Sequence, residues 1–154
     1  MEQEHTPSPS SPPSFGVCVL DASTAEFQLS SFSDDACRTQ LETLLRQLKP
    51  KELIHEKGNL SVSTLRLVRS CVGVDCQWTA LKPGVEFLRA DDTRKELGKL
   101  FAGARRADEE MEDGDEEKAV PESIKMMYDK PVAMSALGGM IWCVVSPSAD
   151  VPVS

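Results

Sequence analysis

The sequence is poor in the residues from which catalytic and metal centres are built. Its 154 residues include two histidines, and its five cysteines contain no Cys-x-x-Cys pair. A structural zinc site usually takes its four ligands from such paired cysteines and histidines, so we expect no metal site. An odd number of cysteines without regular spacing also gives no disulfide framework, which favours free thiols in a reducing compartment.

Long apolar runs and phosphate-binding loops are absent from the sequence as well. No apolar stretch approaches the roughly 20 residues that a membrane-spanning helix needs. The first residues lack the basic start and apolar centre of a signal peptide. Neither GxxxxGK[ST] nor GxGxxG occurs, which excludes the nucleotide-binding modes that depend on those loops. We therefore expect neither a membrane segment nor a bound cofactor in this chain.

The net charge of −8 comes from one segment. Eight of the 25 acidic residues lie between Asp108 and Glu117, and without them 17 basic side chains balance 17 acidic ones. Such an acidic run repels itself and stays solvated. Residues 15–106 carry 14 basic and 12 acidic side chains, a balance too even to predict affinity for the phosphates of DNA.

The chain divides into five segments by composition and hydrophobic pattern. Residues 1–14 are rich in proline and serine without periodicity, which predicts a disordered tail. An ordered domain core follows over residues 15–106, and the acidic insertion over residues 107–119 is predicted to be disordered. Residues 120–145 form a helical segment that packs on this domain or leads into a following one. Residues 146–154 lose all pattern and are predicted to be a second disordered tail.

Four short strands are predicted in the core. The run at 15–21 is apolar on both faces, as in an interior strand. The alternating run at 25–32 is its half-buried partner in a hairpin. Two further strands are expected at 52–55 and 76–81.

Helices are predicted between these strands from apolar residues that recur at helical spacing. One of residues 33–35 is the N-cap of the first helix, Ser61 of the second, and Asp91 or Asp92 of the third. The helix that begins near Pro131 is apolar on nearly every side, so it needs packing partners all round. A hairpin followed by alternating strands and helices predicts an α/β layered domain.

Three residues carry chemistry that a reactive site would need, and each has a simpler explanation. His55 ends a short strand, where a lone histidine is more often a hydrogen-bonded structural residue than a general base. Cys18 lies in an apolar strand, which favours an inert thiol. Asp21 ends the first strand, where a metal-binding acid could lie, but no further acid ends a neighbouring strand. We therefore predict no catalytic, cofactor-binding or metal-ligating residue.

Two other features also have structural explanations. Gly138 and Gly139 lie in the middle of a predicted helix and follow no strand, so we expect them to permit close helix packing and not to bind phosphate. Lys49, Lys51 and Lys57 are expected to cluster near one helix end, where a solvated edge explains them as well as a nucleic-acid contact does.

Three stretches together resemble the connector domain, MutS domain II, of the MutS family of DNA mismatch repair proteins. They are FGVCVLDASTAEFQLSSFSDD, LETLLRQLKPKELIHEKGNLS and KPVAMSALGGMIW, and they recur in the family's order and spacing. The resemblance covers residues 15–142. Within the family the sequence most resembles the fungal form of the eukaryotic sixth MutS homologue, the branch that supplies a subunit of MutSα.

The resemblance implies a ribonuclease-H-like α/β fold, with a mixed sheet and flanking helices, that lacks nuclease chemistry. In the family this domain joins the mismatch-binding domain to the core and lever, and it relays nucleotide-dependent changes toward MutL-type partners. A noncatalytic role in a nuclear protein follows. The ATP and magnesium sites, the mismatched DNA and the second MutS homologue belong to the intact family protein, so we expect no direct DNA contact in this chain.

The sequence departs from the family pattern at both ends. In the family an apolar strand precedes the hairpin and lies centrally in the sheet, whereas here the tail rich in proline and serine takes its place. The last helix runs into SPSADVPVS, where family members continue into the core. These departures predict a fragment whose sheet lacks its first strand.

Two other functions stay open on the residues alone. One is a stand-alone small interaction protein whose acidic loop binds basic partners. The other is a degenerate ribonuclease-H-like nuclease. Metal-dependent cleavage of nucleic acid that is lost when Asp21 is changed would support it.

Overall fold

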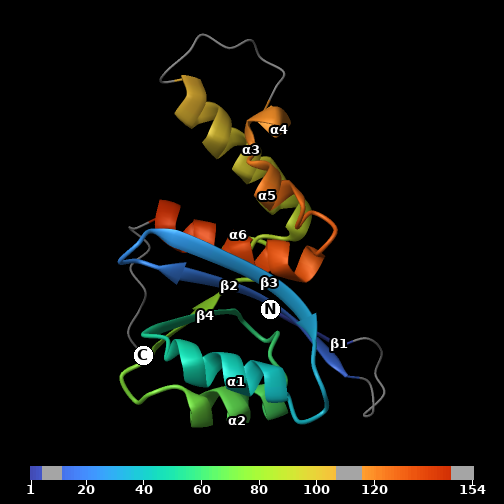
Figure 1. Ribbon diagram of the computed structural model, residues 1–154, viewed down its shortest axis with the longest axis vertical. Helices are drawn as coiled ribbons and strands as arrows, with labels where there is room; N and C mark the ends of the chain where they lie inside the picture. Colours follow the sequence, from blue (N-terminus) through green and yellow to red (C-terminus); the bar gives the residue numbers. More distant parts are fainter. Residues whose placement is uncertain (5–11, 107–115, 147–154) are drawn as a thin grey trace.

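The computed structural model describes residues 1–4, 12–106 and 116–146. Its elements are strands β1 (Glu2–Glu4), β2 (Pro13–Asp21) and β3 (Glu26–Ser33), helix α1 (Thr39–Leu48), strand β4 (Glu52–Glu56), helix α2 (Val62–Cys71), strand β5 (Gln77–Leu81), and helices α3 (Ala90–Arg106), α4 (Glu116–Ala119), α5 (Glu122–Lys125) and α6 (Pro131–Val145). Figure 1 shows α1 and α2 on one side of the strands, α6 on the other side and α3 beyond α6. The predicted α/β class is confirmed.

The predicted hairpin forms and sets the frame of the first sheet. β2 pairs antiparallel with β3 from Ser14 opposite Ser33 to Asp21 opposite Glu26. Because successive side chains of a strand point to opposite faces, β2 contributes to two separate apolar clusters. Phe15 belongs to a cluster with α1 and α2, whereas Cys18 packs against a cluster that α6 and α3 form.

Part of the predicted N-terminal tail belongs to this sheet. β2 begins at Pro13, and Glu2–Glu4 forms β1, which pairs antiparallel with the first residues of β2. The prediction of disorder over residues 1–14 is therefore wrong for both of these stretches, while residues 5–11 lie outside the described part of the chain. Buried polar contacts of Glu2, described below, hold β1 in place, and no apolar pattern signals them.

The strands form two sheets, not the one mixed sheet that the resemblance implies. β1, β2 and β3 make an antiparallel sheet, and β4 and β5 make a parallel pair that runs from Glu52 opposite Gln77 to Glu56 opposite Leu81. Among the described residues no strand joins β2 to β4. The ribonuclease-H-like arrangement therefore stays a prediction.

Helices α1 and α2 cover one face of both sheets. Leu41 of α1 and Val68 of α2 are buried in one cluster with Phe15 of β2. Leu53 of β4 and Trp78 of β5 pack against the same cluster. The two sheets therefore share one apolar layer beneath them, although no strand connects them.

The N-terminus of α1 is capped by a predicted aspartate that lies outside the helix. The Asp34 carboxylate accepts hydrogen bonds from the backbone N–H groups of Gln40 at 3.0 Å and Leu41 at 2.8 Å. Arg38 takes the N-cap position itself, with a φ of 60°. The prediction of a cap among residues 33–35 is thus right in its chemistry and wrong in its position.

The other two N-cap predictions have different outcomes. Ser61 caps α2 as predicted, because its Oγ accepts a hydrogen bond from the Thr64 backbone N–H at 3.2 Å. Helix α3 begins at Ala90, so Asp91 and Asp92 lie in its first turn and not at the N-cap. Acidic side chains in a first turn still interact favourably with the helix dipole.

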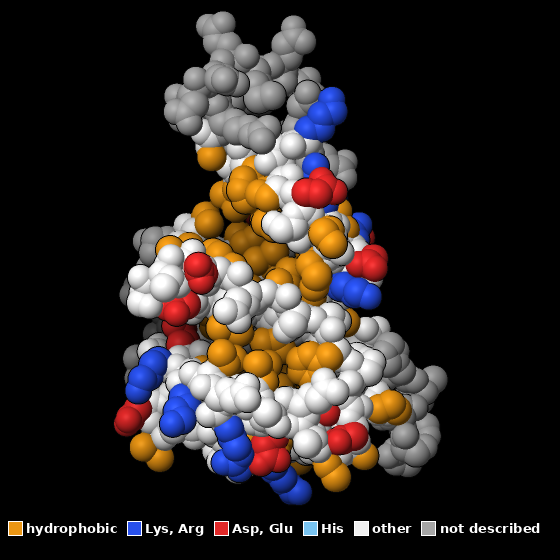
Figure 2. All heavy atoms as spheres, in the orientation of Figure 1, with side chains coloured by type: hydrophobic (Ala, Val, Ile, Leu, Met, Phe, Trp, Pro, Cys, Tyr) orange, Lys and Arg blue, Asp and Glu red, His pale blue; other side chains and the backbone are white. Residues whose placement is uncertain are grey.

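Helix α6 is enclosed by partners, as its apolar sequence predicts. It packs against β2 on one side and α3 on the other, and Ala133 and Met134 are fully buried. Figure 2 shows apolar side chains gathered in the hollow between α3 and α6 and again between β3 and α1. Segment 120–145 therefore packs on the domain.

The acidic insertion ends earlier than predicted. Residues 116–119 form helix α4, which corrects the prediction of disorder through residue 119, and residues 107–115 lie outside the described part of the chain. Ala119 and Val120 are buried, and Val120 packs in one cluster with Leu97 of α3. Burial of these two apolar residues orders the end of the insertion, which the acidic composition of the insertion does not predict.

Gly16 marks the closest approach of α6 to β2. A Cβ at this position would lie 2.2 Å from the carbonyl carbon and oxygen of Val132 and 2.4 Å from the nitrogen of Ala133. These obstacles are backbone atoms of the first turn of α6, so the helix itself would have to move. Gly16 is therefore needed where helix and sheet touch.

The variant Gly16→Ala should lower the free energy of unfolding by about 1–3 kcal/mol, the usual cost of overpacking a well-packed core. Gly103→Ala in α3 is the matched control. Nothing lies within 4 Å of a Cβ there, and alanine should stabilise the helix by up to about 1 kcal/mol. Urea unfolding followed by circular dichroism measures both, and equal effects would contradict the close contact.

Candidate structural joint

His55 and Asp21, which were considered for catalysis, make contacts that fit structural roles. The rings of His55 and Trp78 are T-shaped to each other, with centroids 5.8 Å apart, and Nδ1 of His55 lies 3.2 Å from the carbonyl oxygen of Glu56. The exposed carboxylate of Asp21 accepts hydrogen bonds from the Ser23 hydroxyl at 2.6 Å and the Ser23 N–H at 2.9 Å, which lower the pKa of Asp21. Both residues lie near strand ends, where these contacts hold the chain in place.

The thiol of Cys18 is unreactive in this setting. Burial in the sheet raises its pKa to about 12, so the protonated form persists at neutral pH, whereas the thiolate is the nucleophile and metal ligand. Within residues 1–4, 12–106 and 116–146, no group of three His, Cys, Asp or Glu side chains is placed to hold a metal ion. In the same part of the chain no helix is long and apolar enough to cross a membrane.

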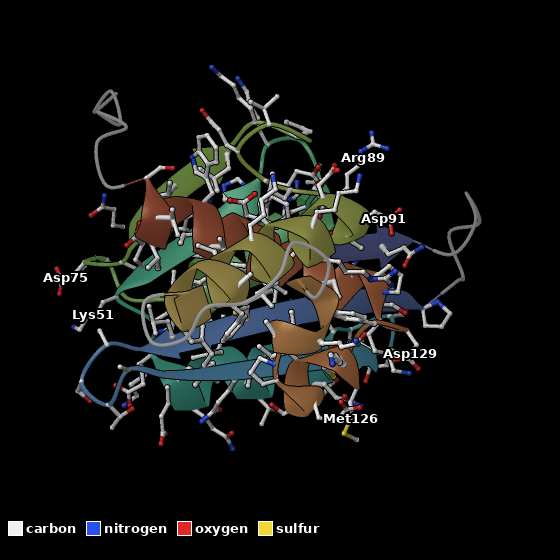
Figure 3. All side chains as sticks on the ribbon, turned by 90° about the horizontal axis from the view of Figure 1, so that it is seen from above. Lys51, Asp75, Arg89, Asp91, Met126 and Asp129 are labelled. Carbon is white, nitrogen blue, oxygen red and sulfur yellow. The ribbon has the colours of Figure 1, made fainter. Side chains whose placement is uncertain are left out.

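The predicted lysine cluster is only partly present. Lys49 and Lys51 line an open cavity of about 450 Å³ at the C-terminal ends of α1 and α2, together with Arg46 and Asp75. Lys57 lies at the other end of β4 and does not join them. Figure 3 shows Lys51 and Asp75 projecting away from the fold at the same end of the molecule. Opposite charges at a solvated edge fit the structural explanation.

A cluster of polar groups, of which Glu2 and Thr64 are buried and the others half-buried, ties β1 to α2. We call it the polar junction: Glu2, Arg38, Asn59, Ser61 and Thr64. The Glu2 carboxylate accepts hydrogen bonds from the Ser61 N–H at 2.6 Å, the Ser61 hydroxyl at 3.0 Å and the Thr64 hydroxyl at 2.8 Å. Glu2 and Thr64 are 3% and 0% exposed. Glu2 therefore acts as a second cap on the N-terminus of α2, where a negative charge is favourable.

Arg38 supplies the balancing positive charge at the polar junction. Its Nη2 lies 3.5 Å from the Glu2 carboxylate, and its Nε donates a hydrogen bond to the Thr64 hydroxyl at 2.6 Å. The Asn59 side chain completes the junction by bonding the backbone N–H and carbonyl of Glu2 at 2.7 and 3.0 Å. A buried carboxylate with this many partners avoids the cost of an unpaired charge.

The α-ammonium group of Met1 lies next to this junction, between the sheets. It donates a hydrogen bond to the Gly16 carbonyl at 2.8 Å. Burial lowers its pKa from the ordinary value of 8.0 to about 6, against the opposing attraction of Glu56 and Glu2. The backbone of Met1 thus continues the pairing of β1 with β2 by one residue.

A second contact surface, which we call the glycine seam, consists of Gly16, Gly138 and Gly139. A Cβ on Gly138 would lie 2.3 Å from the Thr93 hydroxyl, and one on Gly139 would lie 2.6 Å from two ring carbons of Phe87. Thr93 and Phe87 are buried. The prediction that the glycine pair permits close packing of α6 is confirmed, because Gly138 meets Thr93 of α3 and Gly139 meets Phe87 in the segment between β5 and α3.

Arg94 fastens α3 to the segment that precedes α6. Its guanidinium lies over the Tyr128 ring, 5.0 Å from the centroid, and also donates a hydrogen bond to the Tyr128 carbonyl. A cation over an aromatic face is worth about 0.5–2 kcal/mol, more when water is excluded. The polar junction, the glycine seam and the Arg94 contact together hold the sheet, the helices and the connecting segments to one another, and we call them the structural joint.

The components of this joint differ in how visible they are in the sequence. The glycine pair and Ser61 follow from pattern and capping rules. Glu2, Arg38 and Asn59 do not, because the junction brings together residues from segments that are remote in the chain. A buried carboxylate in a stretch rich in proline and serine gives no periodic signal.

The polar junction predicts that Glu2→Ala lowers the free energy of unfolding by about 2–4 kcal/mol, because Arg38 and the hydroxyls of α2 lose a buried partner. Gln3→Ala on the same strand is the control, since Gln3 is exposed and surface changes usually stay within about 0.5 kcal/mol. Denaturant unfolding compares the two variants. A Glu2→Ala effect no larger than that of Gln3→Ala would show that β1 is not bound.

The buried α-ammonium group predicts a dependence of stability on pH. The unfolded chain keeps this proton up to a pKa near 8.0 and the folded chain only to about 6, so the unfolded state binds more protons between these values. The free energy of unfolding should therefore rise by about 2 kcal/mol from pH 6 to pH 8. An N-terminally acetylated chain keeps the N–H donor and should lose this rise. The same slope in both chains would contradict the assignment.

Comparison with known proteins agrees with this fold and these motifs. The family model for MutS domain II matches residues 8–83. The DNA mismatch repair protein MSH6 of Saccharomyces cerevisiae is 32% identical over 132 residues, which cover 83% of this chain and 10% of the yeast protein. The Msh6 protein of Gallus gallus is 29% identical over 137 residues, again 83% of this chain and 10% of the relative.

A plant relative extends the match to nearly the whole chain. The DNA mismatch repair protein MSH6 of Arabidopsis thaliana is 28% identical over 150 residues, which cover 90% of this chain and 11% of the relative. The chain thus spans about a tenth of the length of these relatives. The chain belongs to the MutS family, of which it carries domain II, in a form similar to Msh6.

Proposed function

We propose that this chain is the noncatalytic connector of a MutS-type DNA mismatch repair protein, holding a mismatch-binding domain and a core with its ATPase in register. The observation that carries the proposal is the glycine seam. It presses α6, the last described helix, directly onto the sheet through backbone contacts at Gly16. A displacement of α6 is thereby transferred to β2, because packed interiors deform little.

The surroundings of the polar and reactive side chains support a mechanical role. The polar groups of the junction hydrogen-bond to one another, and burial keeps the Cys18 thiol protonated by raising its pKa. In the proposed whole protein, ATP, magnesium and mismatched DNA bind to other domains. A second MutS homologue and a MutL-type protein are its partners there, and the protein acts in the nucleus, where chromosomal mismatches arise.

The proposal predicts that residues 1–145 of this chain can replace the matching segment of the Saccharomyces cerevisiae relative. In a yeast strain that lacks its own copy of that relative, the chimera should lower the spontaneous mutation rate at least tenfold. The Gly139→Val chimera should lose this effect while the purified protein still hydrolyses ATP, because the added side chain meets the Phe87 ring.

The Gly103→Ala chimera is the matched control and should repair as the unmodified chimera does. A chimera no better than the relative with its connector deleted would overturn the proposal. The alternative, a stand-alone interaction protein, predicts that outcome, because such a chain has no part in coupling two larger domains.

A further inference from the structure

The open cavity at the C-terminal ends of α1 and α2 lies in a basic part of an acidic chain. Residues 36–76, which contain both helices and β4, carry seven basic and four acidic side chains, whereas the whole chain has a net charge of −8. Figure 2 shows Lys and Arg side chains gathered at the lower left, over α1 and α2. Positive charge is therefore concentrated at this end of the molecule.

Two of the three basic side chains that line the cavity are not paired with an acid. Arg46 is paired, because its Nη2 lies 2.8 Å from the Glu42 carboxylate. Lys49 and Lys51 form no ion pair with any described residue. Asp75 is the only acidic residue in the described lining of the cavity, so this lining keeps a net positive charge.

Lys49 ends α1 in a backbone conformation that favours glycine. Its φ of 46° lies in the left-handed region, which glycine adopts at a lower cost than any residue with a side chain. The Lys49 N–H donates a hydrogen bond to the Leu45 carbonyl and closes the helix. A residue that lowers stability at a helix end and lines a cavity is a candidate for binding.

The cavity also offers hydrogen-bond acceptors, because the last turn of a helix leaves carbonyl groups without partners in the helix. The residue four positions after Arg46 is Pro50, which has no N–H to bond the Arg46 carbonyl. Among the described residues no backbone N–H bonds the carbonyl of Arg46 or of Cys71, the last residue of α2. Carbonyl groups of this kind bind N–H donors.

Apolar side chains flank the cavity. Val74 lies between the lining residues Gly73 and Asp75 and is fully exposed, and Leu48, next to Lys49, is 37% exposed. An exposed apolar side chain bordered by charged ones is typical of a surface that contacts another protein. The cavity therefore combines positive charge, backbone acceptors and apolar contact area.

We propose that this cavity binds a segment of a partner protein in which acidic and apolar residues alternate. Carboxylates of the segment would lie beside Lys49 and Lys51, where charge-assisted hydrogen bonds form. Backbone N–H groups of the segment would meet the carbonyls of Arg46 and Cys71. The volume of about 450 Å³ is sufficient for a few side chains.

A peptide fits this lining better than a nucleic acid does. Every residue of a nucleic acid carries a phosphate, which accepts hydrogen bonds and is repelled by Asp75 and by the carbonyls at the helix ends. A peptide can instead place an N–H donor or an apolar side chain beside Asp75 and Val74. The inference goes beyond the proposed connector role, in which this end of α1 and α2 has no part.

The test titrates a fluorescently labelled peptide, Glu-Ile-Asp-Glu-Leu-Asp, with the full chain and follows fluorescence anisotropy. The peptide should bind saturably, and a matched peptide with Gln and Asn in place of Glu and Asp should bind about tenfold more weakly. The double variant Lys49→Gln with Lys51→Gln should weaken binding by a similar factor. Lys57→Gln with Lys95→Gln removes the same charge elsewhere and should change the affinity less than twofold.

The apolar contact is tested separately from the charge. Val74→Ser should weaken binding of the acidic peptide about threefold, because an apolar contact is lost while every charge stays. Val85→Ser is the matched control, since Val85 is 62% exposed and does not line the cavity. In NMR spectra of the unmodified chain, the peptide should shift the backbone amides of residues 46–51 and 71–76, apart from Pro50, and leave those of α3 unchanged.

Several outcomes would overturn the proposal. Absence of saturable binding, or equal weakening by the two double variants, would mean that no specific site exists. A single-stranded thymidine oligonucleotide that binds this cavity more tightly than the peptide would make nucleic acid the ligand. If deletion of residues 108–115 strengthens binding more than tenfold, the acidic run of this chain is the occupant and not a partner.

Discussion

The backbone contact between Gly16 of β2 and the first turn of α6 is the constraint on which the rest of the fold depends. There is no room for a side chain at this contact, so helix and sheet meet at the distance of bare backbones. Gly138 and Gly139 of the same helix leave no room for a side chain either, because they lie against the side chains of Thr93 and Phe87.

The polar junction solves a different problem from the glycine seam. The seam aligns apolar layers, which hydrophobic burial alone would leave free to slide, whereas the junction holds a three-residue strand that has little apolar area to bury. Glu2 does so by placing its carboxylate on the N-terminus of α2 beside Arg38. The two devices meet at Met1, whose buried amino group bonds the Gly16 carbonyl.

Local rules predicted much of this fold. The hairpin, β4, β5, the Ser61 cap and the role of the glycine pair followed from alternation, capping and helical spacing, each of which acts within a few residues. Helix α4 and strand β1 did not follow, because Val120 and Glu2 are held by residues distant in sequence. The separation into two sheets was not predicted either, since it depends on which edges find a partner. For the joint, pattern identified Gly138 and Gly139 and missed Gly16, Glu2 and Arg38.

A double-mutant cycle at the glycine seam tests the central claim most directly. The variants Gly139→Ala and Phe87→Leu are made singly and together, and the free energy of unfolding of each is measured in urea. If the seam is close-packed, the smaller side chain relieves the clash, and the two effects should depart from additivity by more than about 0.5 kcal/mol in the stabilising direction. Additive effects would mean that α6 does not rest on Phe87, and the account of a rigid joint would be wrong.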